Sequence, residues 1–139
     1  MLNLIFIPEI ILSIGVMLII LVDLFFQKQK VVSFSLIQFL LLIAAYYSLN
    51  NHTFPKYNAY TLNEFTSIIK FILLVGSLII FHYSYKHLKF LKILKIEYFT
   101  ISLLGLIGTM IMVSANSLLM LYLGIELLSL SLYALIGFN

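Results

Sequence analysis

The chain has no cysteine, no arginine and no tryptophan, and only 9% of its 139 residues are charged. Without cysteine it cannot form a disulfide or ligate an iron–sulfur cluster through thiolates. Its three histidines, His52, His82 and His87, do not show the spacing of a metal site. A glycine-rich phosphate-binding loop is also missing. The sequence therefore predicts that this chain holds no cofactor and no metal.

Apolar residues dominate the composition. They make up 63% of the chain, and the mean hydropathy is +1.17, whereas a soluble domain has about 45–50% apolar and about 25% charged residues. The net charge of +3 rests on eight lysines. With so few charges, we interpret this balance as a signal of membrane topology and expect membrane lipids, not nucleic acid, around the chain.

Five apolar stretches are long enough to cross a bilayer, which takes about 20 residues. They cover residues 4–26, 31–49, 66–85, 98–114 and 117–138. The sequence thus predicts an all-α integral membrane protein with about five transmembrane helices. The amino terminus has neither the features of a cleaved signal peptide nor those of a transit peptide. We therefore expect the chain to be made where it is inserted, in a bacterium or by the ribosomes of an organelle.

Lysine distribution predicts the orientation. Two lysines lie between the first and second predicted helices and four between the third and fourth, against only Lys56 and Lys70 toward the opposite side. The positive-inside rule then places the amino terminus outside and the carboxyl terminus on the cytoplasmic or matrix side. The four lysines Lys86, Lys89, Lys92 and Lys95 recur every three residues among leucines and isoleucines, which favours a short amphipathic helix at the lipid headgroups.

Small side chains gather on one face of the fourth predicted helix. They are Ser102, Gly105, Gly108 and Thr109, at spacings of three and four residues. Small residues let helix backbones approach closely in lipid. This face is predicted to pack against another helix.

Three charged residues near helix ends have ordinary interpretations. Glu9, next to Pro8, is expected to favour the positive end of the first helix dipole. Asp23 is expected to form an interfacial ion pair with Lys28 or Lys30. Lys70 is expected to extend to the outer surface, with a buried pairing role, as a secondary buried charge, left as the alternative.

Glu126 has no such ordinary interpretation. It lies nine residues beyond Ser117, about 13 Å along a helix, so the headgroups are out of its reach. At 100° per residue, Tyr122, Ser129 and Tyr133 lie within about 60° of it, on one polar stripe. Carboxylates inside a membrane usually mark ion or proton paths. We therefore predict Glu126 to be a proton-path carboxylate, with the three stripe residues as candidates for hydrogen-bond support.

The segment "EYFTISLLGLIGTMIMVSANSLLMLYLGIELLSLSLYALIGF" resembles the fourth and fifth helices of the antiporter-like subunits of respiratory complex I. The similarity is greatest to the type called subunit 2, or subunit N in bacteria, and "GIELLSLSLY" is its most specific part. Further matches are "PEI" and "LVDLFF" at the two ends of the first helix and "FTSIIKFILL" in the third. The resemblance extends over nearly the whole chain.

The resemblance implies a larger fold with two inverted repeats that follow three amino-terminal helices. Residues 1–97 would be those three helices with a basic interfacial segment, and residues 98–139 the first two helices of the first repeat. The buried channel lysines of the family come later in the fold. The chain is therefore either one piece of a split subunit or a fragment. We favour the split subunit, with a second polypeptide carrying the remaining helices, one of whose lysines pairs with Glu126.

The implied function is that of a non-redox, membrane-arm subunit of the proton-translocating NADH:ubiquinone oxidoreductase. Flavin, iron–sulfur clusters and quinone would then belong to partner subunits. The implied location is the mitochondrial inner membrane, with the amino terminus toward the intermembrane space, or alternatively a bacterial plasma membrane. Two other functions stay open: a subunit of a multi-subunit cation/proton antiporter, and a non-conducting structural subunit.

Overall fold

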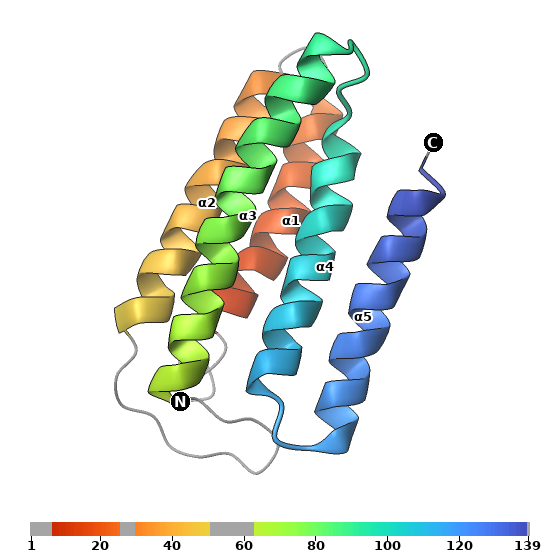
Figure 1. The fold of residues 1–139 in the computed structure, drawn as a ribbon. Coiled ribbons are helices and arrows are strands. Elements are labelled where there is room, and N and C mark those ends of the chain that lie inside the picture. Colours follow the sequence, from red (N-terminus) through yellow and green to blue (C-terminus); the bar gives the residue numbers. More distant parts are fainter. Residues whose placement is uncertain (1–6, 26–29, 51–62, 139) are drawn as a thin grey trace.

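The computed structural model describes residues 7–25, 30–50 and 63–138. Five helices account for nearly all of these residues (Figure 1): α1 (Ile7–Phe25), α2 (Lys30–Asn50), α3 (Glu64–Phe90), α4 (Ile96–Ser114) and α5 (Leu118–Ile136). Each is long and apolar enough to cross a membrane. The predicted all-α membrane fold is confirmed, and four of the helices begin and end within three residues of the predicted ends.

The first four helices pack side by side in a closed ring, the square bundle. Contacts run from α1 to α2, from α2 to α3, from α3 to α4 and from α4 back to α1. Helix α5 lies outside this square and packs against α4 (Figure 1). Since α4 packs against α1 and α3 as well as against α5, the predicted division into residues 1–97 and 98–139 stays a prediction.

An aromatic cluster fills the square near the end where α2 and α4 begin. Phe99 is fully buried and its ring lies 5.3 Å from that of Phe34 and 5.5 Å from that of Phe81, in edge-on arrangements. The rings of Phe34 and Tyr85 stack at 3.9 Å. Because these rings come from α2, α3 and α4, the cluster fixes how the three helices pack at this end.

Helix α3 ends differently from the prediction. It continues to Phe90, and Lys92 then adopts a left-handed backbone conformation with φ 58°. The N–H of Lys92 bonds the carbonyl of Lys89, and the N–H of Ile93 bonds that of Leu88, which is the hydrogen-bond pattern of a Schellman motif. The predicted amphipathic helix over these lysines is therefore wrong: two of them lie on the last turns of α3 and two on the connection to α4.

The predicted small-residue face of α4 packs against α5. A Cβ atom at Gly108 would lie 2.9 Å from the backbone nitrogen of Leu128 and 3.0 Å from the carbonyl oxygen of Gly124. One at Gly105 would lie 2.7 Å from the Ser131 hydroxyl. The two helix backbones thus touch where a glycine of one meets a glycine of the other, which confirms the predicted helix contact.

Replacing Gly108 by alanine should push α5 away from α4. The neighbouring atoms belong to backbone and cannot rotate aside, so we expect a loss of about 1–3 kcal/mol in the free energy of unfolding. SDS-induced unfolding of the purified chain in mixed micelles measures this quantity. Gly76→Ala is the matched control, because nothing lies within 4 Å of a Cβ there, and a gain of up to about 1 kcal/mol from helix propensity is expected. Equal effects of the two substitutions would contradict the close helix contact.

Candidate functional site

Glu126 lies on the face of α5 that is turned away from the rest of the molecule. The contact with α4 is made by Gly124 and Leu128, which come two residues before and after Glu126 and therefore lie about 160° around the helix from it. The helix begins at the Ser117 cap, whose side chain accepts the N–H of Met120 at 3.3 Å. The cap sets the start of α5, and the position along α5 then places Glu126 mid-helix.

The stripe residues contribute unequally to the surroundings of Glu126. The Tyr122 hydroxyl, one turn earlier, lies close to the Glu126 carboxylate. The Ser129 hydroxyl instead donates to the backbone carbonyl of Glu126 at 3.0 Å. Tyr133 is 68% exposed, and within the described ranges it makes no hydrogen bond to Glu126. The structure thus brings one of the three predicted residues to the carboxylate.

This arrangement leaves a carboxylate and two tyrosines on a surface that no described helix covers. Tyr122 is 58% exposed, and α5 is the least buried of the five membrane-spanning helices. At the depth of the hydrocarbon core, polar side chains have to face protein or water. We therefore expect the stripe to face another protein helix or water in the membrane.

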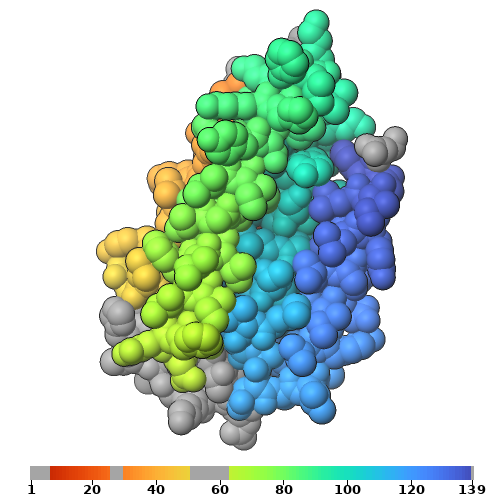
Figure 2. All heavy atoms as spheres, in the orientation of Figure 1, coloured from red at the N-terminus to blue at the C-terminus, as the bar shows by residue number. Residues whose placement is uncertain are grey.

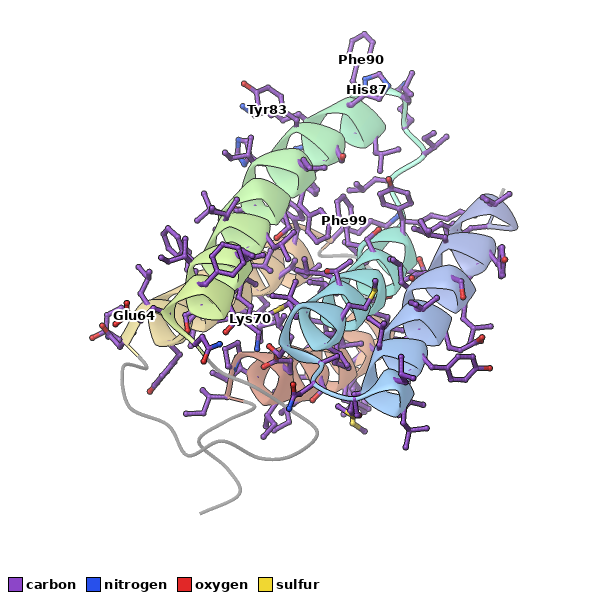
Figure 3. All side chains as sticks on the ribbon, turned by 60° about the horizontal axis from the view of Figure 1, so that its bottom comes forward. Glu64, Lys70, Tyr83, His87, Phe90 and Phe99 are labelled. Atoms are coloured by element: carbon purple, nitrogen blue, oxygen red, sulfur yellow. The ribbon has the colours of Figure 1, made fainter. Side chains whose placement is uncertain are left out.

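Two opposite charges are buried in the square bundle. The Lys70 ammonium of α3 and the Glu9 carboxylate of α1 form a salt bridge, with side chains 1% and 6% exposed. The two helices face each other across a diagonal of the square, and Figure 3 shows Lys70 extending inward from α3. The pair thus links two helices that are not packed neighbours.

The pair changes both earlier interpretations of these residues. Glu9 lies in the first turn of α1 as expected, but its carboxylate is buried against Lys70 rather than capping the helix at the surface. Lys70 does not extend to the outer surface, because its side chain points into the bundle and is buried there; the alternative, a buried pairing role, is what the structure shows. A sequence signal for the pair does exist, because charged residues are rare inside the apolar helices of this chain. Two opposite charges buried at the same end of a bundle are stabilised only if they pair.

Within the described residues, Asp23 forms no salt bridge with Lys30. Asp23 accepts a hydrogen bond from the Ser33 hydroxyl at 3.5 Å, while the Lys30 ammonium donates to the Leu94 carbonyl. Lys28 lies outside the described residues. Glu9–Lys70 is the only salt bridge among residues 7–25, 30–50 and 63–138. Lys30 bonds a backbone carbonyl instead because the connection into α4 passes close to the start of α2.

Known proteins that this chain resembles share one name. The chain is similar to proteins named NADH-quinone oxidoreductase subunit N: that of Ruthia magnifica is 38% identical over 94% of this chain, that of Thioalkalivibrio sulfidiphilus 35% over 96%, and that of Pelagibacter ubique 33% over 95%. The match covers only 28–29% of the length of these relatives. No protein-family model matches the chain.

Proposed function

We propose that this chain, which belongs to the N-type antiporter-like subunit family as a portion of that subunit, supplies the carboxylate half of a proton-path site in the membrane arm of a complex I. The observation that carries the proposal is the position of Glu126, in the middle of a membrane-spanning helix and facing away from α4. The other half would be an ammonium group on a helix that covers the stripe, provided by a second polypeptide with the remaining helices.

The chemistry follows from the two charges. A carboxylate at low dielectric is stabilised as the anion by a nearby ammonium. When the ammonium moves away or loses its proton, the carboxylate takes up a proton, so the two groups titrate as a unit. Protonation at one end of the pair is thereby coupled to charge movement at the other. The hydroxyl of Tyr122 would hold the carboxylate in place during the exchange.

Redox chemistry would take place in partner subunits. Flavin, iron–sulfur clusters and quinone are all assigned to other chains of the complex, and this chain would take part in the enzyme as a non-redox subunit. Lys70 and Glu9 would be a secondary buried charge pair, separate from the stripe because they lie in the square bundle on the other side of α4.

The proposed orientation places the end of α1 and the start of α2 on the matrix or cytoplasmic side. Every described lysine except Lys70 lies at that end of the bundle, on the first residue of α2, the last turns of α3 or the connection to α4. Since Lys70 is buried and paired, it adds no free positive charge to the opposite side. The mitochondrial inner membrane is the proposed location and a bacterial plasma membrane the alternative; the relatives compared above are bacterial.

Affinity purification of the chain from its native membrane tests the assignment. We expect it to bring down subunits that contain flavin and iron–sulfur clusters, together with NADH:quinone reductase activity and a short membrane protein with buried lysines. Recovery with other antiporter-type chains alone would contradict the proposal and favour a cation/proton antiporter. A solubilised mock preparation from the same membrane, without the affinity tag, is the control.

A further inference from the structure

A groove of about 390 Å³ lies between α3 and α5, above α4. In Figure 2 the side chains of α4 are visible between those of α3 and α5. Small and apolar residues line the groove, among them Gly76, Ser77, Ser102, Thr109, Leu132 and Leu135. It faces away from the Glu126 stripe, because Leu135 lies about 180° around α5 from Glu126. The groove and the Glu126 stripe are therefore two separate surfaces, on opposite sides of α5.

Gly76 is the residue that needs an explanation. A glycine inside a helix costs about 1 kcal/mol relative to alanine. On α4, Gly108 is required by the backbone of α5 and Gly105 by the Ser131 side chain. At Gly76 a Cβ would meet nothing within 4 Å. No contact within the described part of the chain requires a glycine there. The lack of a side chain at Gly76 leaves open space at the wall of the groove.

The hydroxyls along the groove are satisfied within their own helices. Ser77 donates to the carbonyl of Leu74 at 2.7 Å, Ser102 to that of Tyr98 at 2.8 Å, and Thr109 to that of Leu106 at 2.7 Å. These side chains are short, and their hydroxyl groups need no water molecule as a hydrogen-bond acceptor. A row of short, satisfied side chains is the surface against which another helix backbone can approach closely in lipid, whereas a lipid tail does not need small residues.

We propose that this groove is the docking site for a transmembrane helix from the remaining part of the subunit, one with small residues on the face that meets Gly76. The relatives are more than three times as long as the matched portion, which is 28–29% of their length, so a helix of this kind is the occupant most directly available. This inference rests on the proposed assembly with the rest of the subunit and not on the proton role of Glu126.

Photo-crosslinking in the assembled complex tests the occupant. A benzophenone amino acid is placed at Ile72, which lines the groove and is 61% exposed, at Tyr122 on the stripe, and at Ile14 on the exposed face of α1 as control. We expect the Ile72 probe to join a transmembrane segment of the remaining part of the subunit, identified by mass spectrometry. A crosslink from Ile72 to lipid only, or to a second copy of this chain, overturns the proposal.

Gly76→Leu provides the matched substitution. It should lower the Ile72 crosslink and the amount of assembled complex by about tenfold, the effect of overpacking a tight contact. The purified chain should unfold no more easily than the parent, because the Cβ enters open space and leucine is a better helix former than glycine. Ile68→Phe, an exposed residue of α3 outside the groove, should leave both unchanged. Normal crosslinking and assembly of Gly76→Leu overturn the proposal.

The Tyr122 probe separates the two hypotheses. If it joins the rest of the subunit while Ile72 joins lipid, the docking site is wrong and the proposed assembly stands. If neither probe joins the rest of the subunit, the proposed assembly fails and the docking site fails with it.

Discussion

Glu126→Gln should reduce the protons pumped per NADH oxidised by about tenfold, while the complex assembles in normal amounts, because intramembrane carboxylates carry charge or protons that an amide cannot. Glutamine has nearly the same shape and can keep the contact with Tyr122. It can neither take up a proton nor attract an ammonium as a carboxylate does. The variant thus removes the proposed chemistry and preserves the packing.

The measurement uses inverted membrane vesicles in which NADH oxidation and acidification of the interior are followed together, with the complex quantified on native gels. Glu97→Gln is the matched control, since Glu97 is an exposed carboxylate in the first turn of α4, and it should leave the ratio unchanged. A normal ratio in assembled Glu126→Gln complex would refute the proton role. Failure to assemble would indicate a structural role instead.

Lys70→Met should lower the free energy of unfolding by about 3–5 kcal/mol, because it leaves the Glu9 carboxylate in a buried site without the ammonium that neutralises it. Glu9→Gln should have an effect of similar size, because it leaves the Lys70 ammonium without the carboxylate that neutralises it. The double variant should be more stable than either single variant, since replacing both members of a buried pair by neutral groups is often close to neutral.

This cycle is measured by SDS-induced unfolding of the purified chain in mixed micelles. Lys86→Met serves as control: Lys86 is an exposed lysine on the same helix, and its replacement should change the free energy by less than about 0.5 kcal/mol. Additive losses in the double variant would show that the two charges do not stabilise each other. The salt bridge across the square bundle would then have no energetic role.

The number of helices and their approximate ends could be predicted because hydrophobic length is a local property of the chain. The small-residue face of α4 was also found from the sequence, but its partner Gly124 was not, since the contact depends on which helix lies alongside. The end of α3 was placed five residues early because the lysines there break the hydrophobic run without breaking the helix. Lys92 ends it in a conformation that lysine only rarely adopts.

The candidate sites divide in the same way. Glu126 could be singled out because its depth follows from its place in one helix. That it faces away from α4 depends on the packing of α4 and α5, which a helical wheel does not contain. The pairing of Glu9 with Lys70 depends on the square arrangement of four helices, and residues 61 positions apart in sequence leave no local pattern that connects them.

The distance in sequence between Glu9 and Lys70 also has a consequence for synthesis. A ribosome adds about 5–20 residues per second, so a separation of 61 residues corresponds to about 3–12 s. During that interval α1 has emerged and its carboxylate has no lysine to meet. We therefore expect the amino-terminal end of α1 to stay at the headgroups or within the insertion machinery until α3 arrives. The burial of the Glu9 carboxylate thus depends on a lysine that is made 61 residues later.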